Sequence, residues 1–429
     1  MPQALRSLCF FVGAIVVLAV LYSSTTLPAT ASTWNVPEAA KGFTDKFKDE
    51  TPPPAADPIY EDTPTSNPPT AVLGLPDKTE EGGDKTDGDA NPPAATATSM
   101  ADALEELSKS PEEFNDAKYA FQLDLNLTMC DANVYDTHHL RKYMPKNFKG
   151  PGNPTFATYL STRNGTIHDP YFMAAMQLTY RVLWDPRSKS EKYPLTVFVA
   201  PFIPQEHRDL LQASGAIVRE LELIEWHPNK ATFGRWKDLF SKLNMWRQTD
   251  YSKIAFLDLD AFPFQNIDEI FDLHETQKCI RELLPEEDRL KEEEICDYTF
   301  FGTQVGGYKE INVGVMVFQP NLAMHARLTR EFLHADKYDN LMAEQAFLSY
   351  AYREDGPFPV AFVDRVWNGF FPQADEEDKL KIVHEKLWSV NEHLPWGQSH
   401  FVNTHQAMCK LYESKEFRKM REDLGKKPF

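Results

Sequence analysis

The segment from Lys253 to Asp260, KIAFLDLD, constrains the fold of this chain more than any other part of its sequence. An apolar run of this kind is typical of a strand buried on both faces of a parallel sheet. The run ends on two acids, Asp258 and Asp260, which are one residue apart. Alternate side chains of an extended strand point the same way, so both carboxylates can face one point while Leu259 packs behind them. The pattern therefore predicts a binding site at the end of a buried strand.

After residue 118 the sequence alternates between short β-rich runs and helical runs. This order implies a mixed, mostly parallel α/β sheet with helices on both faces. Ligands of such sheets bind beyond the carboxyl ends of the strands, where Asp258 and Asp260 are expected to lie. Strands are predicted over residues 155–160, 195–200, 216–221 and 253–260, and helices over residues 169–184 and 233–246.

The composition of the chain changes between residues 32 and 113. Twelve of the 31 prolines lie between Pro37 and Pro111, and Tyr60 is the single aromatic residue between Lys48 and Glu113. Such a segment cannot bury enough apolar surface to offset the conformational entropy lost on folding. We therefore predict three parts: a membrane-targeting segment over residues 1–31, a disordered stem rich in proline and threonine over residues 32–117, and a single folded domain over residues 118–429.

The N-terminal segment is predicted to direct the chain into the secretory pathway. Arg6 precedes the apolar run Leu8 to Tyr22, and no Lys or Arg follows until Lys41, so the positive-inside rule places the N-terminus in the cytosol. The run has 15 residues, fewer than the ~20 that span an average bilayer. Two interpretations remain. The segment is either an uncleaved signal anchor of a single-pass, type II Golgi protein with a luminal domain, or a signal peptide cut after Ala31 from a secreted protein.

Four cysteines follow the apolar run, an even number that an oxidising lumen can pair. Cys279 and Cys296 bracket a charged insertion, CIRELLPEEDRLKEEEIC, which we predict to be a solvated helical excursion closed by a disulfide. Cys130 and Cys409 then remain as a second pair. The sequons at Asn126 and Asn164 agree with the same compartment.

The charge of the chain limits its partners. With 45 basic and 64 acidic residues, neither nucleic acid nor an anionic membrane surface is expected as the main partner. Two carboxylates as close as Asp258 and Asp260 repel each other unless a proton or a cation lies between them. A hard divalent cation is the expected occupant, because it prefers oxygen ligands. Such a cation keeps open positions that suit the oxygens of a diphosphate.

The segment FLDLDAFPFQNIDEIF, residues 256–271, resembles the D-x-D segment of the glycogenin-like glycosyltransferases of family 8. The resemblance implies a GT-A fold, which is Rossmann-like, as a single catalytic domain over residues 118–429. It also implies a metal-dependent, retaining transfer of a sugar from a UDP-sugar to a hydroxyl group. Further similar segments occur in the family's order: SKLNMW (241–246), INVGVMVFQPN (311–321), EQAFLS (344–349) and IVHEKLW (382–388).

The resemblance also implies roles for individual residues. The metal, expected to be Mn²⁺, would be held by Asp258, Asp260 and His384. Glu344 and Gln345 are the expected catalytic residues, either steadying positive charge on the sugar or supplying a nucleophile. The expected donor-binding residues are Lys242 for the nucleotide sugar, Asn312 and Gly314 in the sugar pocket, Lys386 for a phosphate, and Tyr159 or Tyr171 for the uracil ring.

Two other classes of function fit parts of the pattern. A haloacid-type phosphatase also carries D-x-D after an apolar strand, but a Thr or Val normally follows the second acid, and here the residue is Ala261. The other class is a secreted sugar-binding module without catalysis. The partners expected for a transferase are a nucleotide-sugar donor, a glycan or protein hydroxyl acceptor, and a membrane reached through the N-terminal anchor.

Overall fold

The computed structural model describes residues 124–426 except 225–233, 306–309, 340–341 and 391–393. The chain divides into two compact units, Met1–Ala97 and Thr98–Phe429, and all of the described residues belong to the second. The predicted membrane-targeting segment and stem, residues 1–117, lie outside the described residues. Among the residues that the structure does describe, no helix is long and apolar enough to cross a membrane.

The core of the domain is a seven-stranded sheet with the strand order β10-β8-β9-β4-β1-β2-β3. Strands β4, β1, β2 and β3 are parallel to one another, and β9 runs antiparallel between β4 and β8. The mixed, mostly parallel sheet confirms the sequence prediction. The strands are β1 (Asn153–Leu160), β2 (Leu195–Val199), β3 (Ile217–Glu220), β4 (Tyr251–Leu257), β8 (Phe300–Gln304), β9 (Ile311–Phe318) and β10 (Ala361–Val363).

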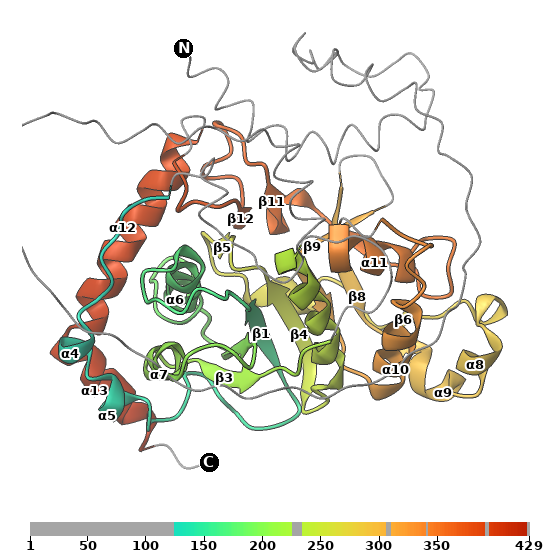
Figure 1. Ribbon diagram of the computed structural model, residues 1–429, viewed down its shortest axis with the longest axis horizontal. Helices are drawn as coiled ribbons and strands as arrows, with labels where there is room; N and C mark the ends of the chain where they lie inside the picture. The colour runs from blue at the N-terminus through green and yellow to red at the C-terminus, as the bar shows by residue number, and fades with distance from the viewer. Residues whose placement is uncertain (1–123, 225–233, 306–309, 340–341, 391–393, 427–429) are drawn as a thin grey trace, which may run out of the picture. The chain divides into compact units, whose positions relative to one another are not determined.

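The connections of the sheet reverse direction between β1 and β4. From β1 the chain moves outward to β2 and β3, with α6 packed on β1 and β2 and α7 on β3, and then returns through η3 to β4 on the other side of β1. Right-handed crossovers place η3 on the opposite face from α6, where it packs against α10 and α11 (Figure 1). Ligand sites form at such a reversal. These helices are α6 (Pro170–Leu183), α7 (Gln205–Ala213), η3 (Gly234–Arg247), α10 (Leu322–Glu331) and α11 (Ala343–Ala351).

The start of α6 follows the predicted capping pattern. The Asp169 carboxylate accepts a hydrogen bond from the backbone N–H of Phe172 at 2.9 Å, and Pro170 occupies the first helical position. Both features stabilise a helix N-terminus because they satisfy or remove donors that have no partner within the helix.

The predicted helix over residues 233–246 is present from Gly234, but it is a 3₁₀-helix rather than an α-helix. The sequence pattern predicted one buried stripe, whereas residues 240–246 are all buried in the structure. Polar members of this run are satisfied by specific partners: the Ser241 hydroxyl accepts from Ile224 N–H, and the Asn244 amide donates to Glu222 O. The apolar spacing indicated a helix buried on one face, whereas residues 240–246 are buried on every face.

A small second sheet brings a C-terminal strand to the end of β4. In this sheet β12 pairs with β5 in antiparallel and with β11 in parallel orientation. Its strands are too short to show a periodic pattern, and the sequence analysis predicted only the residues around His384. The elements are β5 (Ala261–Pro263), η4 (Asp268–Asp272), η7 (Arg365–Trp367), β11 (Gly369–Phe370) and β12 (Ile382–His384).

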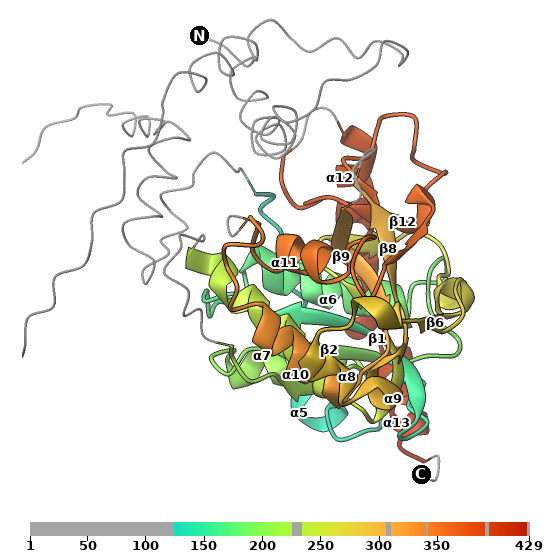
Figure 2. The same ribbon diagram turned by 90° about the vertical axis from the view of Figure 1, so that its right-hand side faces the viewer.

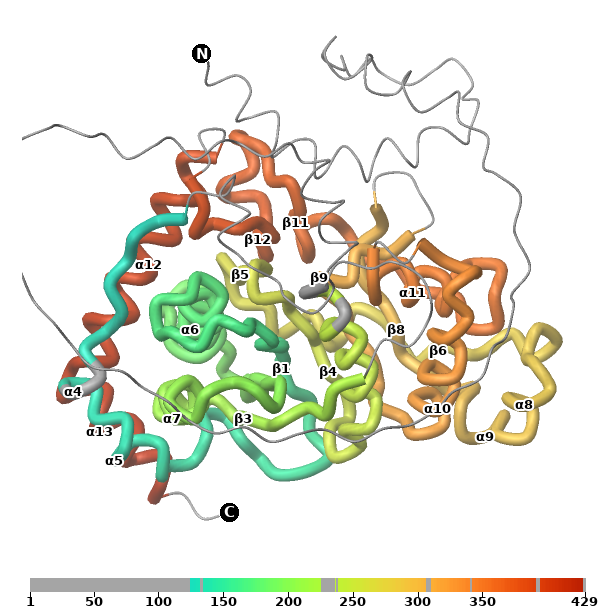
Figure 3. The backbone as a smooth tube through the Cα atoms, in the orientation of Figure 1, coloured from blue at the N-terminus to red at the C-terminus, as the bar shows by residue number. Residues whose placement is uncertain are grey.

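The first described residues pack against the last helices of the chain. Figure 3 shows the segment after residue 124 running beside α12, and a disulfide joins Cys130 to Cys409 as predicted. The His405 ring lies 2.8 Å from the backbone oxygen of Thr128, which adds a second link between the same segments. The elements are α4 (Ala132–Tyr135), α5 (Thr137–Leu140), α12 (Pro395–Tyr412) and α13 (Lys415–Leu424).

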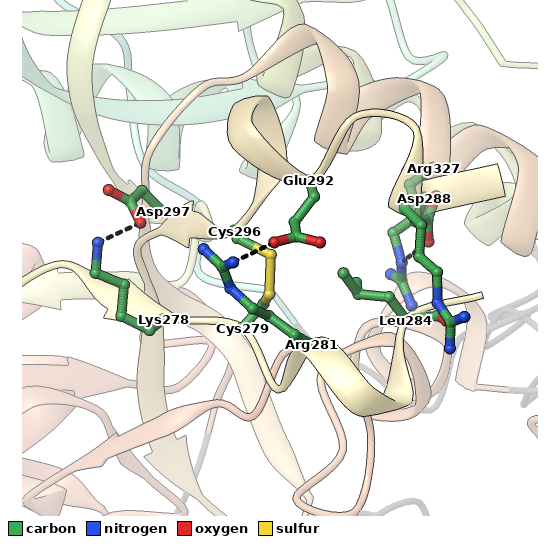
Figure 4. The surroundings of a disulfide bond; sticks show 10 residues. Lys278, Cys279, Arg281, Leu284, Asp288, Glu292, Cys296, Asp297 and Arg327 are labelled. Carbon is green, nitrogen blue, oxygen red and sulfur yellow. Dashed lines mark hydrogen bonds and ion pairs between the residues drawn. A yellow bond between two sulfur atoms is a disulfide. The ribbon is translucent and has the colours of Figure 1, made fainter. Parts of the chain in front are cut away.

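The predicted charged excursion is confirmed, with a disulfide between Cys279 and Cys296 at its base (Figure 4). Its two short helices lie beside α10 (Figure 2), where Asp288 forms a buried ion pair with Arg327 at 3.1 Å. The disulfide therefore closes the base of the excursion, and the ion pair joins the excursion to α10. Its elements are β6 (Gln277–Lys278), η5 (Arg281–Leu283), α8 (Glu286–Arg289), α9 (Glu292–Ile295) and β7 (Asp297–Tyr298).

Candidate active site

Strand pairing brings the two aspartates and a distant histidine together. In the small sheet His384 lies opposite Ala261, and the N–H of Glu385 donates to Asp260 O at 2.9 Å. This register places His384 next to Asp260. As a result Asp258, Asp260 and His384 each offer one ligand atom, and these atoms lie within 4.8 Å of one another.

The charges of this group favour a bound cation. The Nε2 atom of His384 lies 3.3 Å from Asp260 Oδ1. Burial by itself would raise the pKa of Asp260, but the His384 ring opposes this effect, and the pKa falls to about 2. Burial disfavours a charged His384, yet Asp260 and Asp258 outweigh it and raise the pKa of the imidazole. Both shifts show that the site stabilises positive charge between the carboxylates.

The donor set fits a divalent metal ion. Two carboxylate oxygens and one imidazole nitrogen are ligands that Mn²⁺ and similar ions accept. Three protein ligands also leave coordination positions open, which is the arrangement of catalytic rather than structural metal sites. Asp258, Asp260 and His384 can therefore hold the metal that the sequence predicted.

Gly314 allows the β9 backbone to approach the His384 ring. The N–H of Asp258 donates to Gly314 O at 2.7 Å, which ties the end of β4 to β9. A Cβ atom added to Gly314 would lie 2.0 Å from Cε1 of His384, far inside van der Waals contact. Only glycine fits here. The sequence predicted Gly314 in the sugar pocket; the structure places it against the ring of the third metal ligand.

Lys242 lies between two carboxylates beside the metal group. Its ammonium is 2.7 Å from Asp258 Oδ1 and 2.8 Å from Glu344 Oε1, and its side chain is 2% exposed. Burial would lower the pKa of Lys242, but Asp258 and Glu344 raise it above its usual value. Burial also raises the pKa of Glu344, against the opposing effect of Lys242. The lysine therefore balances the charge of two predicted site residues, and this placement favours an electrostatic role for Glu344 over that of a nucleophile.

Comparison with known proteins gives plant galactinol synthases and one uncharacterized yeast protein as relatives. No family model matches the chain. Galactinol synthase 6 of Arabidopsis thaliana is 28% identical over 49% of this chain and 66% of its own length. An uncharacterized protein of Schizosaccharomyces pombe is 26% identical over 60% of this chain and 78% of its own length. Among plant galactinol synthases the chain spans 61% to 66% of their length.

The match to the galactinol synthases agrees with two earlier observations. The chain carries the segments that resemble family 8 in the expected order, and its structure has the α/β sheet that they imply. This chain is similar in sequence to sugar-transferring enzymes of the galactinol synthase type. The glycosyltransferase GlyE of Streptococcus pneumoniae TIGR4 is a similar solved structure, with a TM-score of 0.42 and 13% identity over 65% of this chain and 67% of its own. The galactinol synthase relatives support an enzyme of the hexosyltransferase class, for which a nucleotide-sugar donor and a hydroxyl acceptor are implied.

Two of the predicted donor-binding residues, Lys386 and Tyr171, lie close to each other. The Lys386 ammonium lies 5.8 Å from the centre of the Tyr171 ring, and that ring packs on Trp388 with 5.3 Å between centres. Tyr159, at the end of β1, is only 4% exposed, so contact between its ring and a uracil requires movement of its neighbours. Of the two tyrosines that the sequence left open, Tyr171 is the more accessible. Phosphate binding by Lys386 and uracil binding by a tyrosine remain predictions.

The side-chain oxygen of Asn312 already accepts two hydrogen bonds. This Oδ1 atom accepts from Gly314 N–H at 3.0 Å and from the Asn368 amide at 2.9 Å, so the Asn312 NH₂ group is the part left to donate to a sugar hydroxyl. Gln345 follows Glu344 in the first turn of α11 and is half-buried. The predicted roles of Asn312 in sugar binding and of Gln345 in catalysis remain predictions. The sequence analysis missed Asn368, because no motif or spacing singles it out in the segment VWNGFF.

Proposed function

We propose that this glycosyltransferase moves a hexosyl group from a UDP-sugar to a hydroxyl group of a glycan or protein, with retention at the anomeric carbon and with Mn²⁺ as the metal. The observation that carries the proposal is the convergence of Asp258, Asp260 and His384, whose ligand atoms lie within 4.8 Å of one another. The plant relatives support transfer of a sugar, since they are named for the synthesis of galactinol.

Asp258, Asp260 and His384 would hold the metal. When bound, the metal supplies positive charge that stabilises the leaving diphosphate. In the transfer, the bond between the anomeric carbon and the diphosphate oxygen breaks, and its electron pair leaves with the diphosphate. The acceptor oxygen forms the new bond to the anomeric carbon, and its proton passes to the leaving diphosphate.

Neighbouring side chains would orient the donor and control the local charge. The side-chain oxygen of Asn312 already accepts two hydrogen bonds, so its NH₂ group would serve as the donor to a sugar hydroxyl. Lys242 pairs with both Asp258 and Glu344, and a Glu344 carboxylate would add negative potential that favours a positively charged sugar ring in the transition state. Lys386 would contact a phosphate of the donor, with its ammonium near the Tyr171 ring.

We further propose that the domain works in the lumen of the secretory pathway, either anchored in the Golgi membrane by the run from Leu8 to Tyr22 or secreted. Two disulfides, Cys130–Cys409 and Cys279–Cys296, support this location, because disulfides persist in oxidising compartments and are rare in the cytosol.

A donor screen tests the proposed function. Purified protein is incubated with each of several UDP-hexoses, with Mn²⁺ or with EDTA, and UDP release is measured with and without hydroxyl acceptors. The proposal expects release with one donor, dependent on Mn²⁺ and faster with an acceptor. A non-catalytic sugar-binding module would bind the donor without releasing UDP. A haloacid-type phosphatase would instead release phosphate from a phosphomonoester.

A further inference from the structure

We propose that Asn368 positions His384 for metal binding by fixing which ring nitrogen carries the proton. This inference rests on the proposed function, because it concerns the metal site of that function. Asn368 lies between η7 and β11 and is fully buried. Its side-chain oxygen lies 2.9 Å from Nδ1 of His384, and its side-chain nitrogen lies 2.9 Å from Oδ1 of Asn312.

The direction of each hydrogen bond follows from a backbone group. The Gly314 N–H can only donate, and it donates to one side-chain atom of Asn312 at 3.0 Å. That atom must therefore be the Asn312 oxygen. The Asn368 atom that contacts the same oxygen must be a donor, so it is the NH₂ group.

The other end of the Asn368 amide is then an oxygen, and it faces Nδ1 of His384. A hydrogen bond forms there only if Nδ1 carries the proton. The neutral ring consequently has its lone pair on Nε2, the atom that lies 3.3 Å from Asp260 Oδ1. The chain from Gly314 through Asn312 and Asn368 thus presents Nε2 as the metal ligand.

The backbone holds Asn368 and His384 in register. Strand β11 begins one residue after Asn368 and pairs with β12, with Gly369 opposite Val383 and Phe370 opposite His384. The Asn368 N–H donates to Arg365 O at 2.9 Å. Because Gly314 leaves no free space against the ring, the ring of His384 is fixed both at its face and at Nδ1.

An amide oxygen suits this position electrostatically. Histidines that bind metals usually donate their second ring N–H to a carboxylate or a carbonyl oxygen, and loss of that partner weakens metal binding by about 10- to 100-fold. A carboxylate would add a third negative charge beside Asp258 and Asp260. The neutral Asn368 orients the ring without adding charge to the site.

The test compares Asn368→Leu and Asn368→Asp in the purified full-length chain, with Mn²⁺ affinity read from the electron paramagnetic resonance of free Mn²⁺. Asn368→Leu removes the acceptor for His384 Nδ1–H, and its affinity is expected to fall about 10- to 100-fold. Asn368→Asp keeps the acceptor, loses the donor to Asn312 and adds a negative charge that attracts a cation, so its affinity should fall by no more than a few-fold from wild type. Asn321→Leu is the control, because it removes two hydrogen bonds of a similar amide outside the site.

The measured affinities decide the matter. Wild-type affinity in Asn368→Leu overturns the inference, and so does an Asn368→Asp affinity as weak as that of Asn368→Leu, since Asn368 would then act only as a packing residue. Where a thermal melt shows that Asn368→Leu is unfolded, Asn368→Asp alone decides: retained affinity supports the inference and lost affinity contradicts it. Absence of Mn²⁺ binding by the wild-type chain contradicts the proposed function itself.

Discussion

At the scale of single residues, Gly314 is a position where one added methyl group should disable the metal site. Gly314→Ala would place Cβ 2.0 Å from Cε1 of His384, so the ring must move away from Asp260. We expect Mn²⁺ affinity to fall at least about tenfold, as measured by calorimetric titration. Gly165→Ala is the matched control, because its Cβ would meet nothing closer than a Pro204 carbon at 3.4 Å. Equal affinity of the two variants would contradict this assignment of Gly314.

Lys242 carries a second prediction at the same scale. Lys242→Met leaves Glu344 buried without its partner, and breaking a buried ion pair in this way costs about 3–5 kcal/mol of unfolding free energy. Urea denaturation without metal measures the loss. The double variant Lys242→Met/Glu344→Gln should recover part of it, because the unpaired buried charge is then gone. A single variant as stable as wild type would show that the short Lys242 contacts, 2.7 and 2.8 Å, contribute nothing to the folded state.

At the scale of elements, the sequence correctly predicted those helices and strands that have a clear local pattern of apolar and capping residues. The apolar runs of β1, β2 and β4 and the Asp169-Pro170 start of α6 were located correctly, and Asp258 and Asp260 followed from the end of β4. Strands of two or three residues, such as β11 and β12, have no periodicity to detect, and β12 pairs with β5, which lies more than 100 positions earlier. His384 was therefore predicted only through family resemblance, and Asn368 was not predicted at all.

The charged excursion gives a prediction for one element. Removing its disulfide with Cys279→Ala/Cys296→Ala should lower the free energy of unfolding by at most about 3 kcal/mol, the loop-closure contribution for a short loop. The buried pair between Asp288 and Arg327 remains to hold the two helices in place. We expect faster proteolysis between residues 280 and 295 and unchanged Mn²⁺ affinity. A loss of Mn²⁺ binding would show that the excursion supports the site, contrary to this account.

At the scale of the whole domain, the Cys130–Cys409 disulfide joins segments separated by 279 residues, whereas the excursion's disulfide spans 17. Closing the longer loop removes more entropy from the unfolded chain, about 5 kcal/mol against about 3 kcal/mol. Cys130→Ala/Cys409→Ala should therefore lower the thermal midpoint more than Cys279→Ala/Cys296→Ala does. Calorimetry under identical conditions makes the comparison. The reverse order would indicate that the first described segment docks on α12 independently of its disulfide.

We propose that Asp258, Asp260 and His384 form the metal centre of a sugar-transfer site. The most direct test of this proposal measures Mn²⁺-dependent UDP release from the preferred UDP-hexose by wild-type protein, Asp260→Asn and a control, Asp355→Asn. The Asp355 side chain is 86% exposed, so its variant should behave like wild type. The account predicts that EDTA abolishes release by wild type, that Mn²⁺ restores it, and that Asp260→Asn, folded by thermal melt, stays at least about 100-fold slower even at high Mn²⁺. Release by Asp260→Asn at the wild-type rate and with the same Mn²⁺ dependence would contradict it.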